Sequence, residues 1–311
     1  MDGRDAVDPP AANCTWAPKV RVLFVTSEFC GYLKAGGLGE VSAALPRALA
    51  GVCDIRVLMP AYPAVRKRHQ HIEVIKEMPA VAGLPAWSLG RAETPDGLTL
   101  YFVICDALYD RDGSPYGASG TDFGDNDVRF ARLSMAAAEI AEGTADPNWR
   151  PHVVHANDWP TALTPAYIKW KELDTASILT IHNLAYQGLF GRDQLGALAI
   201  PEQAMSIEGV EFHGRVSFLK AGIFYASHVH FLVVGSHVRW DFVPVETADP
   251  FGHAFESLLC RLSSRCASSE FPHRFDKEPC EAVFFQLHSP LPPFTSGSPN
   301  MSRCYARACR R

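Results

Sequence analysis

Apolar runs and amphipathic segments alternate along the first 230 residues of the chain. Short β-rich runs bounded by turn residues predict strands over 20–26, 55–59, 98–105, 152–155 and 176–181. Apolar residues at helical spacing predict helices over 41–49, 127–142 and 160–170. Residues 64–97 are mixed and leave room for one or two short strands, and a long loop is expected after the third strand. This alternation is typical of an α/β fold with a Rossmann-like parallel sheet and helices on both faces.

Polar residues follow three of the predicted strands. In an open parallel sheet, ligands gather at the carboxyl ends of the strands, so these residues are the first candidates for a site. Lys34 and several glycines follow the first strand, Asn157 and Asp158 follow the fourth, and His182 and Asn183 follow the fifth. Each has a structural alternative, because Asp158 and Asn183 can cap the next segment and His182 can be a hydrogen-bonded interior histidine. Asp158 is the one acid that we expect at these strand ends.

The segment Lys34-Ala35-Gly36-Gly37-Leu38-Gly39-Glu40 joins the first strand to the first helix. Glycines let a ligand approach the backbone, the first amides of a helix are free to donate, and the helix dipole favours negative charge there. With the positive charge of Lys34, this pattern predicts a seat for a phosphate or a phosphorylated sugar. The alternative is an ordinary strand-to-helix turn. The spacing matches neither the dinucleotide fingerprint nor the P-loop.

Composition narrows the class of protein. The 311 residues, 47% of them hydrophobic, are enough for one large domain or two of ordinary size. A net charge of −5 gives no field that would gather nucleic acid or an anionic membrane, and no run is long enough to span a bilayer. Residues 1–18 have neither the basic start nor the apolar stretch of a signal peptide, so we expect a disordered leader on a cytoplasmic protein. The nine cysteines fit no zinc pattern, and no metal site is expected.

Several motifs resemble those of the bacterial glycogen synthases and plant starch synthases. They are the strand and glycine segment over 25–40, the loop 108–116, the stretches 149–159 and 180–188, and the helix expected over 216–222. Three departures from the family pattern are visible: Glu40 stands for Asp, Asn157 for His and His213 for Asn. The resemblance is nearly continuous from residue 20 to residue 229 and implies the first half of a two-domain glycosyltransferase of the GT-B type.

The resemblance weakens abruptly near residue 230. From there to residue 311 neither helical nor strand periodicity is sustained, and prolines, serines and five cysteines accumulate. Such a stretch is poor material for a packed core. We therefore predict an amino-terminal catalytic domain over 19–229 and an unrelated or frame-shifted tail over 230–311 that is poorly ordered. The alternative is a natural divergent tail.

The resemblance also implies a reaction. Glucose is transferred from ADP-glucose to the free 4-hydroxyl at the non-reducing end of an α-1,4-glucan, glycogen or starch, with retention and without metal or cofactor. Breaking the anomeric bond leaves negative charge on the diphosphate, which preorganised cations and amides stabilise. The resemblance implies that Lys34 and the amides of Gly36 and Gly37 face those oxygens.

On the sugar side, the resemblance implies that His182 and Asp158 are catalytic residues. Asp158 is expected to bind sugar hydroxyls or to act on a proton if suitably placed. Tyr116 and Asn183 are implied as further substrate-binding residues. None of these roles follows from spacing alone.

In the family architecture the active site lies between two domains, and the second domain supplies further cations, a glutamate and most contacts to adenosine. No candidate for these groups is found after residue 230, so the chain resembles half of an active site and its activity is doubtful. The alternative function is a non-catalytic module that binds a glucan or a partner protein. The residues of this half of the site do not determine whether the donor is ADP-glucose or UDP-glucose.

Overall fold

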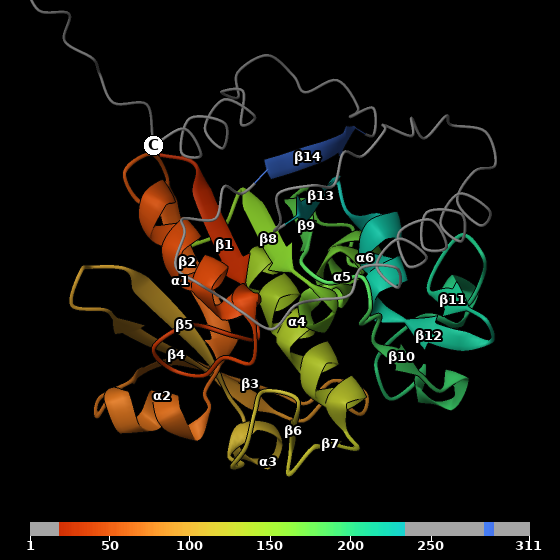
Figure 1. The fold of residues 1–311 in the computed structure, drawn as a ribbon, viewed down its shortest axis with the longest axis horizontal. Coiled ribbons are helices and arrows are strands. Elements are labelled where there is room, and N and C mark those ends of the chain that lie inside the picture. Colours follow the sequence, from red (N-terminus) through yellow and green to blue (C-terminus); the bar gives the residue numbers. More distant parts are fainter. Residues whose placement is uncertain (1–18, 234–282, 289–311) are drawn as a thin grey trace, which may run out of the picture.

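The computed structural model describes residues 19–233 and 283–288, and the described part is built around one sheet (Figure 1). The strand order is β14-β13-β9-β8-β1-β2-β5-β4-β3. The strands are β1 (Arg21–Val25), β2 (Asp54–Pro60), β3 (Glu73–Met78), β4 (Trp87–Glu93), β5 (Thr99–Ile104), β8 (Val153–Asn157), β9 (Ala176–Ile181), β13 (His228–Val233) and β14 (Val283–His288). Neighbours from β13 to β5 pair in parallel, whereas β14, β4 and β3 pair antiparallel at the two edges. The predicted parallel sheet is confirmed.

The central strands are apolar along their whole length because both of their faces are covered. In β1, Leu23, Phe24 and Val25 have no exposed surface, and in β5 the four residues from Leu100 to Val103 are equally buried. Strands with one solvated face would alternate in polarity instead. Continuous burial therefore agrees with helices on both sides of the sheet.

The helices divide between the two faces. They are α1 (Gly37–Leu49), α2 (Pro63–Arg68), α3 (Asp106–Tyr109), α4 (Asn126–Glu142), α5 (Leu163–Trp170) and α6 (Phe218–Tyr225), with short 3-10 turns η1 (Trp159–Thr161), η2 (Arg192–Gln194) and η3 (Glu202–Ala204). Helix α5 packs between α4 and α6, so these three form one layer. The chain moves in opposite directions along the sheet from β1 to β2 and from β8 to β9, so right-handed crossovers place α1 on the other face from α5.

Several boundaries differ from the expectation. The region 64–97 holds helix α2 as well as β3 and β4, and the long loop after β5 contains α3 and a small hairpin of β6 (Gly117–Ala118) and β7 (Thr121–Asp122). Helix α1 starts four residues earlier than predicted, at Gly37.

The helix expected over 216–222 begins only at Phe218, because the side chain of Ser217 caps α6 by accepting the Lys220 amide at 3.1 Å. Ser217 itself ends β12 (Arg215–Ser217). That strand lies between β10 (Leu189–Phe190) and β11 (Glu211–Phe212) in a separate small sheet.

Most of the two segments predicted to flank the catalytic domain lies outside the described residues. The expected leader over 1–18 and the tail beyond residue 233, apart from β14, belong to this undescribed part. Strand β13 crosses the predicted boundary at residue 229, since it pairs in parallel with β9 from His228 to Phe231. The sheet thus continues four residues past that boundary.

Candidate active site

The sheet has one topological switch point, between β1 and β8. The chain leaves β1 toward β2 and β5 and later leaves β8 in the opposite direction toward β9 and β13. The carboxyl ends of β1 and β8 therefore lie side by side with their connections diverging, which is where ligands bind in open α/β sheets. Glu28 follows β1, Asp158 follows β8, and His182 follows β9 at the same edge. The structure brings together the strand ends that the sequence singled out.

The glycine loop, residues 34–37, opens toward solvent. Gly36 is the N-cap of α1 without a side-chain cap, and Gly37 is its first residue. A Cβ atom built on Gly36 or Gly37 would have no neighbour within 4 Å. Neither residue has a positive φ, so the fold itself does not demand glycine here. The free space in front of the helix amides is what a close-approaching ligand requires.

Lys34 is the first residue of this loop, and its side chain already has a partner in the protein. Its ammonium forms an ion pair with Glu40, and both side chains are about half exposed. The hydrogen bond to Glu40 raises the pKa of Lys34, and the same contact lowers the pKa of Glu40. The departure from Asp to Glu at residue 40 thus gives a side chain that reaches Lys34. Gly39 between them is required by packing, because a Cβ atom there would lie 2.6 Å from that of Lys34.

Glu28 is a functional candidate that the sequence analysis missed, and the expectation of Asp158 as the only acid at the strand ends is wrong. Glu28 is 3% exposed and stands three residues beyond the last residue of β1. Its Oε2 accepts the amides of Ala35 at 2.8 Å and Gly36 at 3.0 Å. The Gly36 amide, expected to face a ligand, is therefore already bonded within the protein. The sequence signal that could have identified Glu28 is an acidic residue only three positions after a buried strand.

Tyr116 reaches the site from the loop after α3. Its hydroxyl donates to Glu28 Oε1 at 2.6 Å and lies 3.2 Å from Ser27 Oγ. Burial and the neighbouring Glu28 carboxylate raise the pKa of Tyr116 well above its ordinary value, so the hydroxyl keeps its proton. The ring packs near that of Trp159, with centroids 5.9 Å apart. The structure thus places Tyr116 beside Glu28 at the end of β1, and its role in binding a substrate stays a prediction.

Asp158 is buried at the end of β8, with 7% of its surface exposed. Burial raises the pKa of its carboxyl to about 7, and the charge of Glu28 adds to this rise. Amides of Trp159, Asn183 and His182 oppose it by donating toward the carboxyl. The contact from Trp159 to Oδ1, at 3.1 Å, is the capping role that the sequence analysis gave as an alternative.

His182 and Asn157 form a pair at the same edge. The Asn157 amide donates to the carbonyls of Val25 and His155, both at 3.1 Å, so its Oδ1 is left to accept. Oδ1 lies 3.1 Å from His182 Nε2, which places the proton on that nitrogen and leaves Nδ1 as an acceptor. Burial lowers the pKa of His182 to about 4, so the ring is neutral near pH 7. A neutral ring with a free acceptor suits a sugar hydroxyl.

Asn183 is placed differently from the other candidates. Its side chain is exposed, and Oδ1 accepts the amide of Ala185 at 3.0 Å in a local turn. This is the structural alternative considered for Asn183. Its backbone amide, rather than its side chain, faces Asp158.

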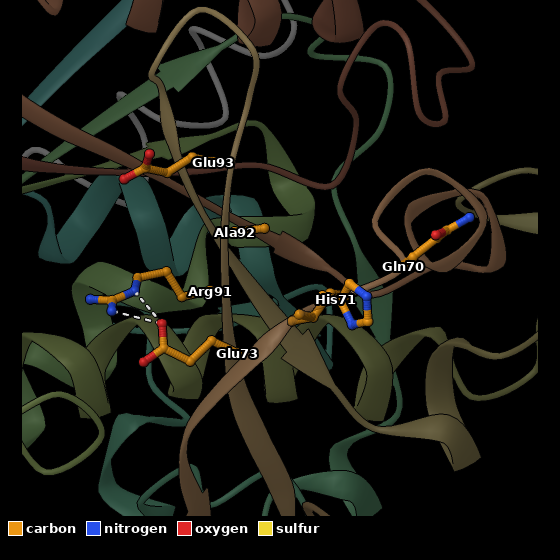
Figure 2. Close-up of a pocket in the computed structure, with 7 residues that line it drawn as sticks. Gln70, His71, Glu73, Arg91, Ala92 and Glu93 are labelled. Atoms are coloured by element: carbon orange, nitrogen blue, oxygen red, sulfur yellow. Dashed lines mark hydrogen bonds and ion pairs between the residues drawn. The ribbon is translucent and has the colours of Figure 1, made fainter.

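A pocket of about 640 Å³ lies elsewhere, on β3 and β4. It is lined by Gln70, His71, Ile72, Glu73, Arg91, Ala92 and Glu93, with Arg91 paired to Glu73 at 2.7 Å (Figure 2). Because Glu93 pairs with Thr99 at the start of β5, this pocket lies toward the amino ends of the parallel strands. It contains none of the predicted site residues.

The described residues contain neither a candidate metal cluster nor a helix suited to a membrane. Within 19–233 and 283–288 no group of three or more His, Cys, Asp and Glu side chains could hold a metal ion. In the same part of the chain no helix has the length and apolar character needed to cross a membrane.

Comparison with known proteins places this site in a family. The family model described as the starch synthase catalytic domain matches residues 21–232. Glycogen synthase of Pseudomonas putida is 50% identical over 286 residues, which covers 89% of this chain and 54% of that protein. Glycogen synthase 1 of Bradyrhizobium diazoefficiens is 51% identical over 237 residues, which covers 76% and 50% respectively. The chain spans about half the length of the curated relatives it matches.

A solved structure shares the fold. The catalytic domain of starch synthase IV from Arabidopsis thaliana, bound to ADP and acarbose, matches with a TM-score of 0.55 at 22% identity, covering 68% of this chain and 44% of that one. The family match includes the parallel strands from β1 to β9 and all the site residues described above. The chain therefore belongs to the starch synthase catalytic domain family.

Proposed function

We propose that this chain carries the amino-terminal half of a glycogen synthase, a retaining hexosyltransferase that moves glucose from ADP-glucose to the non-reducing end of an α-1,4-glucan. The observation that carries the proposal is the convergence of Asp158, His182 and Tyr116 beside an open glycine loop at the switch point. Relatives named glycogen synthase support it, as does a structure of the same fold bound to ADP and acarbose. The cytoplasmic location stays a prediction.

The diphosphate side of the site is formed by Lys34 and the start of α1. In the transfer, the bond from the anomeric carbon to the diphosphate oxygen breaks, and the acceptor 4-hydroxyl forms the new glycosidic bond and releases its proton. The electron pair of the broken bond stays on ADP, so negative charge develops at the diphosphate. The Lys34 ammonium and the Gly37 amide, both on the exposed loop, stabilise that charge.

The sugar side of the site is formed by a neutral imidazole, His182, and by a carboxyl group, Asp158, that is about half protonated near pH 7. Asp158, whose pKa is about 7, is able to donate or accept a hydrogen bond there. His182 accepts through Nδ1, since its Nε2 faces Asn157. Both groups can form hydrogen bonds with sugar hydroxyls. Asn183 contributes through its backbone rather than through its side chain.

The test is incorporation of labelled glucose from ADP-glucose into glycogen by the full chain. Lys34→Ala is expected to lower the rate at least tenfold, because a charge-stabilising group is removed. Lys169→Ala is the matched control, since Lys169 is an exposed lysine in the last turn of α5, far along the helix from the carboxyl end of β8, and is expected to change nothing. Incorporation by the wild type that Lys34→Ala leaves intact would contradict the proposed role of the loop.

Glucan binding without transfer is the second candidate. It is favoured by the observation that Lys34 is held by Glu40 and the Gly36 amide by Glu28, while the sugar-side groups are in place. Co-sedimentation with glycogen distinguishes the two functions. Binding that persists in Lys34→Ala, with no incorporation by the wild type, would favour glucan binding over transfer as the function of this chain.

A further inference from the structure

Among the residues that the structure describes, no cation pairs with the buried carboxylate of Glu28. It is 3% exposed, and none of the ion pairs found among the described residues includes it. Burying such a group is costly unless hydrogen bonds replace its hydration. Three donors do so: two amides at the start of α1 and one tyrosine hydroxyl. Because burying this carboxylate costs stability, its position calls for a functional or structural reason.

The three donors are divided between the two carboxylate oxygens. Oε2 accepts from Ala35 and Gly36 in the glycine loop, whereas Oε1 accepts from Tyr116, about 80 residues further along the chain. Ser27 also contacts the Tyr116 hydroxyl, at 3.2 Å, but its side chain has no bond to the glycine loop. Among these residues, only Glu28 connects both segments.

We infer that Glu28 is a positioning residue that fixes the distance between the glycine loop and Tyr116, and so couples the two sides of the site. The two sides are named diphosphate and sugar by the proposed function, on which this part of the inference rests. Because Glu28 already holds the Gly36 amide, the amide left to a diphosphate oxygen is that of Gly37.

Hydrogen exchange tests the coupling without any ligand. Tyr116→Phe removes one hydroxyl and leaves the ring, so Glu28 loses a donor at the oxygen opposite the loop. The amides of Ala35 and Gly36 are then expected to exchange at least threefold faster by NMR, although Tyr116 does not touch them. Tyr186→Phe is the control, because Tyr186 is a 62% exposed tyrosine in another loop. Unchanged exchange of both amides in Tyr116→Phe would overturn the inference.

Glu28→Gln extends the test to ligand binding. Glutamine keeps the size of the side chain but turns one acceptor oxygen into a donor, so it cannot accept from both sides. We expect at least tenfold faster exchange of the Ala35 and Gly36 amides, and at least fivefold weaker ADP binding by calorimetry, in Glu28→Gln. Tyr116→Phe should weaken ADP binding in the same direction, and the double variant should be no weaker than Glu28→Gln alone.

The two proposals fail separately. Absence of ADP binding by the wild type would count against the proposed function, while the exchange measurements would still decide the role of Glu28. ADP binding equal to wild type in both variants, or strictly additive losses in the double variant, would overturn the coupling and leave the proposed function standing.

Discussion

Asp158 is held in a backbone conformation that few residues with a side chain adopt. Its φ is 61° and its ψ is 180°. Such a conformation persists only where the surrounding structure imposes it, and it is most frequent at functional sites. Here the Asp158 amide donates to the carbonyl of Thr180 at 2.8 Å, which ties the residue to the end of β9. Asp158 also buries a carboxyl group, so at this residue two costs to stability coincide with the proposed chemistry.

We expect Asp158→Asn to stabilise the protein in mild base. The native state keeps a proton on Asp158 that the unfolded chain, with a carboxyl pKa near 4, has lost, so wild-type stability falls as the pH rises from about 4 to about 7. Asparagine escapes this penalty. Relative to wild type, the variant should gain on the order of 3 kcal/mol of unfolding free energy between pH 5 and pH 8.

Urea denaturation at the two pH values measures this gain. Asp174→Asn, at an exposed carboxylate, is the control and should follow the wild type. If the Asp158 variant and the wild type keep the same difference at pH 5 and pH 8, the carboxyl group does not titrate as described.

Burial keeps His182 neutral, and its partner Asn157 adds no charge that would oppose this. Asn157→Asp places a carboxylate where Oδ1 now lies 3.1 Å from His182 Nε2. An adjacent negative charge favours the imidazolium, so the pKa of His182 should rise from about 4 by at least one unit. NMR titration of the ring measures it, with Asn148→Asp, at an exposed position after α4, as the unaffected control. A His182 titration unchanged in Asn157→Asp would show that the two side chains are not paired.

At the scale of elements, the loop that carries Tyr116 depends on the first turn of α4. Arg129 is 1% exposed and donates to the carbonyls of Leu108 and Pro115, both at 2.9 Å, and to Asn126. Asn126 in turn donates to the Tyr116 carbonyl at 2.8 Å. A buried arginine with satisfied donors can fix a loop that has little core of its own. Helix α4 therefore holds Tyr116 in place without touching its hydroxyl.

Arg129→Met should loosen this loop. The methionine fills similar space but leaves the Leu108 and Pro115 carbonyls without their donor, so we expect a loss of about 2 to 4 kcal/mol in unfolding free energy. Amides over 108–117 should exchange faster than those of β1. Arg111→Met is the control: Arg111 pairs with Asp125 near the same loop but is about one-third exposed, so its effect should be small. Equal effects of the two substitutions would argue against an anchoring role for Arg129.

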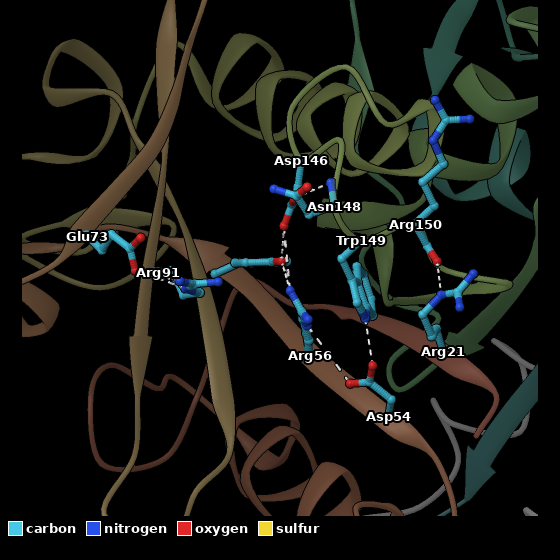
Figure 3. Close-up of polar contacts among 10 residues, drawn as sticks. Arg21, Asp54, Arg56, Glu73, Arg91, Asp146, Asn148, Trp149 and Arg150 are labelled. Atoms are coloured by element: carbon cyan, nitrogen blue, oxygen red, sulfur yellow. Dashed lines mark hydrogen bonds and ion pairs between the residues drawn. The ribbon is translucent and has the colours of Figure 1, made fainter. Parts of the chain in front are cut away.

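At the scale of the whole molecule, the two ends of the parallel strands, which form the carboxyl edge and the amino edge of the sheet, have different roles. The carboxyl edge carries the site, and the amino edge carries a polar cluster around Arg56 (Figure 3). Arg56 lies 3.5 Å from Asp146 and over the ring of Trp149, with 4.4 Å to its centroid. Trp149 Nε1 donates to Asp54 at 2.8 Å, and Tyr101 donates to Asp146 at 2.5 Å. The cluster joins β2, β5 and the segment before β8, away from the site.

We expect Arg56→Met to destabilise the protein without weakening ligand binding. It leaves Asp146, 3% exposed as a side chain, without its cation, which should lower the unfolding free energy by about 2 to 4 kcal/mol. ADP and glycogen affinities measured well below the melting temperature should match the wild type. Arg192→Met, which breaks an exposed pair with Glu202, should leave the urea midpoint almost unchanged. Weaker ADP binding in Arg56→Met would mean that the two edges are not independent.

The sequence by itself determined the elements and most of the candidate site. Strand and helix periodicities are local, so the strands over 21–25 and 176–181 and the helix over 126–142 could be predicted to within a residue or two. A polar residue just after an apolar strand is also a local pattern, which is why Lys34, Asp158 and His182 could be named from the sequence. Local patterns failed where short elements interrupt a loop, as with the hairpin of β6 and β7, and at some helix starts, as with α1 and α6.

Only the tertiary structure decided how these residues are used. That Glu28 holds Gly36 and Tyr116, and that Arg129 holds the Tyr116 loop, depends on contacts between segments far apart in the sequence. The pKa of Asp158 likewise comes from burial and from Glu28, neither of which a local pattern contains. Periodicity records which face of an element is buried. It does not record which residue that face contacts, because the contacts depend on the order of strands in the sheet.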